Sequence, residues 1–149
     1  RLAYGAAGGF GAQIPMEDAE AAIKELYHWS KAELSWQAPP GLASKECVKI
    51  LLILAQAASD CVPRGGKVTV AASADGYTVE AQGPRAMLHA ELAAALAGNF
   101  EDLKPKFAPA YIAGLLARET GGTIEAVLEG ERVTFTARLA ASHRRAAAC

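Results

Sequence analysis

The sequence predicts an α+β domain in which a mixed, mostly antiparallel sheet carries helices on one face. Apolar residues recur at helical spacing in four segments, and shorter segments between them alternate apolar and polar side chains. Their order along the chain is helix, strand, helix, then two strands, two helices and two final strands. The 149 residues suit one domain with its own core, and no segment repeats.

The first predicted elements are a helix over 15–30 and a strand over 32–37. Pro15 suits the first turn of the helix, and Glu17 and Asp18 place negative charge at the positive end of its dipole. Residues 32–37 (AELSWQ) alternate apolar and polar, as a half-buried strand does.

The most strongly indicated helix covers residues 44–62. Ser44 is a suitable N-cap, and the apolar face that follows is broad, which predicts packing on more than one side. Cys47 and Cys61 lie in this stretch, and we expect both to be small core residues.

The second half of the chain is predicted to contain two hairpins. The Asp75-Gly76 dipeptide between alternating segments indicates a hairpin of strands 67–72 and 77–82. The remaining elements are a helix at 88–96, an irregular link at 99–106, a helix at 107–120 ended by Gly121-Gly122, and a hairpin of strands 123–128 and 132–139 around Gly130.

Composition excludes several classes of partner. The net charge is −1, so nucleic acid, which attracts clustered Lys and Arg, is not expected. No apolar run approaches the roughly 20 residues that span a bilayer, so no membrane segment is expected. The three cysteines form no CxxC pair or metal-ligand spacing, and we expect no metal site. An odd cysteine count is typical of a reducing compartment, so a cytoplasmic location is expected.

Two segments resemble the ATP-binding domain of two-component histidine kinases. Residues 48–70 (VKILLILAQAASDCVPRGGKVTV) are similar in spacing to the kinase helix with its LxNLxxNAxKFT-like pattern, turn and strand. Residues 115–139 (LLARETGGTIEAVLEGERVTFTARL) resemble the kinase ending of helix, GGxIxV and final strand. The resemblance implies the Bergerat, or GHKL, fold, a two-layer sandwich.

The residues that serve ATP in those kinases are replaced here. Ile53 and Ala57 stand where asparagines would hold magnesium and phosphate, and neither offers an oxygen ligand. In the DxGxG adenine loop, Ala81 replaces the carboxylate and Arg85 replaces the second glycine.

The phosphate loop is replaced as well. Phe107 and Pro109 stand at the glycine positions of the GxG turn that would approach the phosphates. Only about ten residues separate the two later helices, too few for a lid over ATP. The sequence therefore predicts a degenerate nucleotide site without ATP, magnesium or another cofactor.

A closer resemblance is to the ChpT-type histidine phosphotransferases. It rests on residues 1–8 (RLAYGAAG), 32–37 (AELSWQ), 83–92 (GPRAMLHAEL) and 110–126 (AYIAGLLARETGGTIEA). The resemblance implies an N-terminal helical hairpin that dimerises into a four-helix bundle. A histidine on its first helix would accept phosphoryl from the receiver domain of a hybrid kinase and pass it to an aspartate of a response regulator.

The resemblance also divides the chain. Residues 1–12 are expected to be the end of a hairpin helix and a linker, 13–140 the degenerate ATPase-like domain, and 141–149 a tail. The phosphorylated histidine is expected upstream, so no catalytic residue is assigned among His28, His89 and His143. We expect a homodimer where the hairpin is present, and no kinase, ATPase or other catalysis by this fragment alone.

Docking of receiver domains is the remaining expected role. Arg85, Met87, Leu88 and His89 are predicted to contact them, because Arg anchors interfaces and exposed Met and Leu add apolar contact. The alternative is that Met87 and Leu88 pack the start of a helix. Two other functions stay open: an ATP-binding kinase or ATPase domain with rewired ligands, and a non-catalytic scaffold of the same fold.

Overall fold

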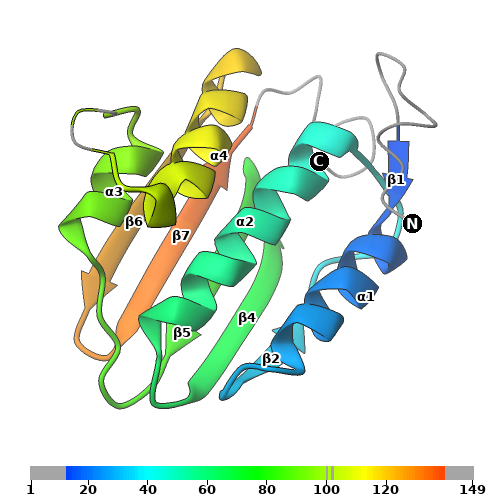
Figure 1. The fold of residues 1–149 in the computed structure, drawn as a ribbon. Helices are drawn as coiled ribbons and strands as arrows, with labels where there is room; N and C mark the ends of the chain where they lie inside the picture. The colour runs from blue at the N-terminus through cyan, green and yellow to red at the C-terminus, as the bar shows by residue number, and fades with distance from the viewer. Residues whose placement is uncertain (1–12, 100, 102, 140–149) are drawn as a thin grey trace.

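The protein forms two layers, a five-stranded sheet and a set of helices that all cover the same face (Figure 1). The computed structural model describes residues 13–99, 101 and 103–139. The predicted α+β class, with a mixed sheet and helices on one face, is confirmed. The expected hairpin-helix end within residues 1–12 and the tail at 141–149 lie outside the described residues.

The sheet is mixed because its first strand pairs in parallel. Residue Ala32 lies opposite Gly66 in this parallel pair, whereas the remaining neighbours in the sheet are antiparallel. The parallel pair needs a crossover connection, which a helix supplies. The strands lie in the order β2 (Ala32–Trp36), β4 (Gly66–Ser73), β5 (Gly76–Gln82), β7 (Arg132–Arg138) and β6 (Thr123–Glu129).

A second, two-stranded sheet was not predicted. Strand β1 (Gln13–Pro15) pairs antiparallel with β3 (Leu42–Ser44), and the two strands immediately precede the helices α1 (Met16–Tyr27) and α2 (Lys45–Cys61). Segments of three residues are too short to show alternation, so only their pairing reveals them. The pair fixes the starting points of both helices, and the Met16 amide donates to the Gly41 carbonyl at 2.8 Å.

The helices begin and end within a few residues of the predicted bounds. The central helix α2 is capped as predicted, because the Ser44 hydroxyl accepts a hydrogen bond from the Cys47 amide at 3.1 Å. It packs on the sheet, on α1 and on α4, which explains its broad apolar face. The helices are α1 (Met16–Tyr27), α2 (Lys45–Cys61), α3 (Ala90–Leu96) and α4 (Ala108–Glu119), with a 3-10 turn η1 (Pro105–Phe107) before α4.

The core lies between the helices and the inner face of the sheet. Val68, Val79 and Phe135 are fully buried there, and each large apolar side chain removed from water contributes about 1.5–3 kcal/mol. Cys47 and Cys61 are buried as predicted. No helix in the described part of the chain is both long and apolar enough to cross a bilayer.

Candidate functional site

A small pocket gathers four of the residues predicted to form the degenerate nucleotide site. Ile53 and Ala57 reach it from α2, Phe107 from η1 and Pro109 from α4. Its volume is about 60 Å³, whereas pockets for small molecules span roughly 300–1,000 Å³. The other lining residues are Gln56, Asp60, Cys61, His89, Leu92, Lys106 and Ala110.

The Phe107 ring is part of the wall of this pocket. The side chain is 6% exposed, and its ring centroid lies 5.8 Å from that of His89. Lys106 places its Nζ 5.7 Å from the centre of the same ring, within reach of a cation–π interaction. An aromatic side chain thus lies at the position where the kinase pattern has a glycine turn, with a cation beside it.

The helices around the pocket are also held closely together. A Cβ atom on Gly114 of α4 would lie 2.2 Å from the Leu96 carbonyl oxygen, so α4 approaches the end of α3 as only glycine allows. Arg118 Nη1 donates to the same oxygen at 3.2 Å and caps α3. This contact joins the two helices that a nucleotide lid separates in the kinase pattern.

Ala81 and Arg85 lie outside the pocket lining. Ala81 is fully buried in β5, between Val68 and Val133 on the neighbouring strands, where its methyl group is part of the core. Arg85 is exposed on the loop after β5. The structure thus brings Ile53, Ala57, Phe107 and Pro109 together, but not the two adenine-loop positions.

The backbone of Arg85 has an unusual conformation. Its φ of 109° makes it the one non-glycine residue with a positive φ in the described part of the chain. The Ala86 amide donates to the Gly83 carbonyl at 3.2 Å, and Pro84 precedes Arg85. This is the arrangement of a type II turn, which favours glycine at the position of Arg85. The kinase pattern has a glycine there, so the backbone shape is kept although the side chain differs.

The residues after the turn are tied to the end of α2. The Met87 amide donates to the Cys61 carbonyl at 2.9 Å, while the Met87 side chain is 40% exposed. Leu88 packs against the core, so the packing alternative describes this residue, at least in part. His89 is half-buried as the N-cap of α3, with its ring near Phe107. Of the four predicted docking residues, Arg85 and Met87 present the most free surface.

Ionisable groups near the pocket give no sign of a nucleophile. Burial, with a contribution from Asp60, raises the pKa of the Cys61 thiol to about 12, so the thiol stays protonated at neutral pH. A hydrogen bond from Lys104 at 2.7 Å lowers the pKa of Glu91 and raises that of Lys104. No group of His, Cys, Asp and Glu in the described residues could hold a metal ion.

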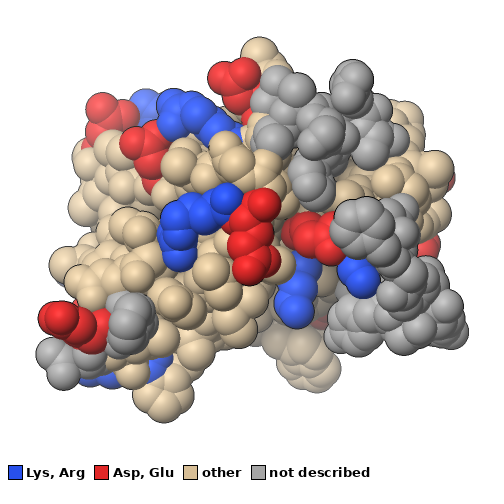
Figure 2. All heavy atoms as spheres, turned by 90° about the horizontal axis from the view of Figure 1, so that it is seen from above, with Lys and Arg blue, Asp and Glu red and all other residues tan. Residues whose placement is uncertain are grey.

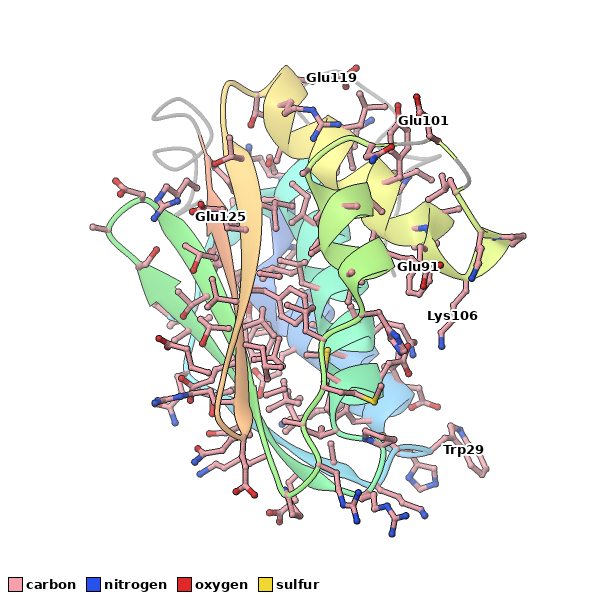
Figure 3. The ribbon with its side chains drawn as sticks, turned by 90° about the vertical axis from the view of Figure 1, so that its left-hand side faces the viewer. Trp29, Glu91, Glu101, Lys106, Glu119 and Glu125 are labelled. Atoms are coloured by element: carbon pink, nitrogen blue, oxygen red, sulfur yellow. The ribbon has the colours of Figure 1, made fainter. Side chains whose placement is uncertain are left out.

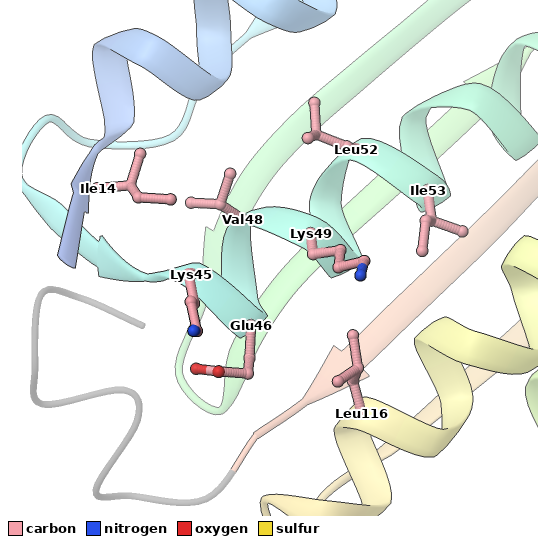
Figure 4. A pocket seen from close by; sticks show the side chains of 8 residues that line it. All are labelled: Ile14, Lys45, Glu46, Val48, Lys49, Leu52, Ile53 and Leu116. Atoms are coloured by element: carbon pink, nitrogen blue, oxygen red, sulfur yellow. The ribbon is translucent and has the colours of Figure 1, made fainter. Parts of the chain in front are cut away.

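Two further hollows on the helix layer were not predicted. An apolar groove of about 560 Å³ lies beside the first half of α2, with Ile14, Val48 and Leu116 in its lining and Lys45 and Lys49 beside them (Figure 4). A second, more polar cleft of about 520 Å³ lies between the ends of α1 and α2. The exposed tryptophan in the YHWSK segment was the available signal for the second cleft.

Charges are mixed on the face seen from above in Figure 2. Lys and Arg lie among Asp and Glu, and neither sign forms a continuous field on the described part of that face. The expectation that nucleic acid is not a partner stays a prediction.

The sheet order and the helices on one face define the class of this protein by its fold, which is that of the histidine-kinase, GHKL-type, ATPase domains. It superposes with a TM-score of 0.64 on the catalytic domain of histidine kinase ThkA, at 14% identity over 88% of this chain and 95% of that one. A mycobacterial sensor histidine kinase, MprB, gives 0.63 at 13% identity, over 88% and 100% of the two chains. At such identities these likenesses show the fold alone.

The chain belongs to the histidine phosphotransferase C-terminal domain family, whose model matches residues 16–132. A bacterial phosphotransferase structure matches with a TM-score of 0.77 and 25% identity, over 92% of this chain and 70% of that chain. The protein phosphotransferase ChpT of Brucella abortus (strain 2308) is 37% identical over 70 residues, which are 47% of this chain and 34% of that relative. The aligned segment thus spans about a third of the relative, and the predicted ChpT-type resemblance is confirmed.

Proposed function

We propose that this domain docks receiver domains for a phosphorelay and does not bind ATP. The observation that carries the proposal is the combination of a pocket of only about 60 Å³, lined by Phe107, with an exposed and strained Arg85 on the loop after β5. The small pocket disfavours the ATP binding of a kinase domain. The strained backbone of Arg85 is typical of a functional position, since such strain concentrates at binding and active sites.

Both the space in the pocket and the chemistry of the degenerate nucleotide site disfavour ATP. The pocket of about 60 Å³ is far smaller than the roughly 300–1,000 Å³ of small-molecule sites, and the buried Phe107 lies at a position where the kinase pattern has glycine. A nucleotide would find no carboxylate for its adenine amine, because Ala81 is an alanine within the core. Ile53 and Ala57 offer no oxygen to magnesium.

The loop after β5 presents a charged and an apolar side chain that favour docking. The Arg85 guanidinium is exposed, and the 40% exposed Met87 adds an apolar contact beside it. Receiver domains bring the acceptor aspartate and the magnesium, so the phosphotransferase need supply only a positioned imidazole and a docking surface.

Within this proposal the imidazole comes from an upstream helix. His28 is exposed at the end of α1, and His89 is committed to its contact with Phe107. We extend the proposal to a homodimer built by an N-terminal hairpin and to a cytoplasmic location, as the ChpT-type family suggests.

Two measurements test the proposal. Calorimetry with a non-hydrolysable ATP analogue and magnesium should show no binding, and micromolar affinity would restore the kinase or ATPase alternative. Receiver domains from response regulators and hybrid kinases of the same genome should bind the chain in biolayer interferometry. If none of these receiver domains binds the chain, the scaffold alternative of the same fold is favoured.

The variant Arg85→Glu identifies the contact. Reversing an exposed interface charge should weaken receiver binding by about tenfold or more and leave the melting temperature unchanged. Wild-type affinity in this variant would remove Arg85 from the docking surface. A loss of several degrees in melting temperature would instead assign the side chain to packing.

A further inference from the structure

We propose that Trp29 and the cleft beside it form a second anchor for the receiver domain; this rests on the docking function proposed above. Trp29 is 85% exposed, the highest value among the large apolar side chains of the described residues. Tryptophan is rarely left in water, and it is enriched among the residues that carry binding energy at interfaces.

The ring is exposed because of where α1 ends. The helix ends at Tyr27, and a turn follows in which the Ser30 amide donates to the Tyr27 carbonyl at 3.0 Å. The Trp29 ring lies edge-on to the neighbouring His28 ring, with centroids 5.0 Å apart. Tyr27 itself points inward and donates to the Ala55 carbonyl, so this end of α1 is anchored without Trp29.

Beside the ring lies the cleft of about 520 Å³ between the ends of α1 and α2. Trp29 and Lys31 line one side, Ser59 and Asp60 of α2 line the floor, and Lys106 reaches it from η1. Figure 3 shows Trp29 and Lys106 on the helix side of the molecule, with Lys106 extending toward the end at which Trp29 lies. The cleft therefore combines an apolar anchor with charged and polar groups.

This cleft adjoins the small pocket, whose lining includes His89, one of the predicted docking residues. Gln56, Asp60 and Lys106 line both the cleft and the small pocket that contains Phe107. The Met87 amide bonds to the Cys61 carbonyl, next to Asp60, which joins the loop to the same end of α2. A partner that contacts Met87 and reaches along α2 thus arrives at the cleft.

Charge favours a receiver domain as the occupant. Lys31, Arg64, Lys106 and Arg85 are exposed around this end of the molecule, and Asp60 is the carboxylate in the cleft lining. A receiver presents the carboxylates that hold its magnesium and accept phosphoryl, so its contact face is acidic. A basic rim around an aromatic centre is complementary to that face.

The test uses intrinsic fluorescence. The chain has two tryptophans, and Trp36→Phe leaves Trp29 as the single reporter. Adding a receiver domain that binds the wild-type chain should shift the Trp29 emission to shorter wavelength, because the ring leaves water. An unchanged emission at saturating receiver would overturn the proposal.

The affinity of variants for the receiver domain provides a second test. Trp29→Ala should weaken binding of that receiver by about tenfold or more, as truncation of an interface anchor does. Lys106→Glu should weaken it by roughly threefold to tenfold. The control is Val127→Ala, which changes a 50% exposed residue of β6, outside the cleft, and should leave affinity unchanged.

The outcomes separate the two proposals. If no receiver binds the wild-type chain, the docking function itself fails. If receivers bind wild type and Trp29→Ala equally, the docking function stands and the second anchor is wrong. A blue shift that depends on the concentration of the chain alone would show that Trp29 contacts a second copy, which also overturns the proposal.

Discussion

Two substitutions of Arg85, on the loop after β5, distinguish the effect of its strained backbone from the effect of its side chain. Arg85 holds a φ of 109° at the third position of a type II turn, where glycine is favoured. Arg85→Gly should relieve the strain, and Arg85→Ala should keep it, because the Cβ atom remains. Both variants remove the guanidinium group.

The magnitude follows from two opposed terms. Strained backbone at a non-glycine residue lowers the free energy of unfolding by about 1–3 kcal/mol, which glycine would recover. The greater freedom of glycine in the unfolded chain lowers it again by about 0.5–1 kcal/mol. The net gain for Arg85→Gly is about 1 kcal/mol. Unfolding entropy is about 2.1 cal/mol/K per residue, so 149 residues convert this gain into a rise of about 3 °C in Tm.

The assay combines thermal unfolding with receiver binding. Arg85→Gly should raise Tm by about 3 °C, whereas Arg85→Ala should lie within about 0.5 kcal/mol of wild type. Both should lose receiver affinity to a similar extent, since both lack the guanidinium. Stability would then rise in the same variant in which function falls, as is common where a site is strained.

Two results would refute the reasoning. Equal melting temperatures for Arg85→Gly and Arg85→Ala would show that the turn stores no strain at this position. Wild-type receiver affinity in Arg85→Ala would show that the side chain makes no contact with the partner.

Four further variants test the packing, the buried Cys61 thiol and the closed pocket. Gly122→Ala should lower the free energy of unfolding in urea by roughly 2–4 kcal/mol, because the added Cβ would lie 1.8 Å from the Arg138 carbonyl oxygen. Gly130→Ala is the control: its Cβ would lie in open space, and the φ of +62° should cost about 1 kcal/mol. Burial raises the pKa of the Cys61 thiol to about 12, so between about pH 9 and pH 12 the unfolded state releases a proton that the folded state retains. This one group should lower the free energy of unfolding by about 1.4 kcal/mol per pH unit in that window. The fall should be less steep in Cys61→Ala, and an equal slope would contradict the cause. Phe107→Ala should destabilise the domain by about 3–5 kcal/mol without creating affinity for an ATP analogue in calorimetry, and new micromolar binding would show that Phe107 alone closes the site.

The regular elements of the fold could be predicted because their signals are local. The Ser44 cap and the periodic face after it locate α2, and Asp75-Gly76 locates the first hairpin, since each depends on residues a few positions apart. The small β1–β3 sheet could not be predicted. Gln13–Pro15 and Leu42–Ser44 are adjacent in space but distant in sequence, and neither is long enough to show a period.

The candidate site was predictable in part. The sequence indicated that oxygen ligands are missing at Ile53 and Ala57, because side-chain chemistry is read directly from residue type. It also suggested Phe107 as an obstacle, but not that the ring would lie against His89. That contact depends on how η1 and the start of α3 meet beside α2, which is set by packing of the helices.

The sequence by itself determined the order of the longer helices and strands, the family and the loss of nucleotide-binding side chains, because all three depend on residue identity and short-range spacing. Tertiary structure alone decided the size of the remnant pocket, the positive φ of Arg85 and the exposure of Trp29 beside a cleft. Each of these properties depends on segments that are distant in the sequence, namely α1, α2, η1 and the loop after β5, and that the fold brings together. Free volume, backbone strain and solvent exposure arise only when such segments pack against each other.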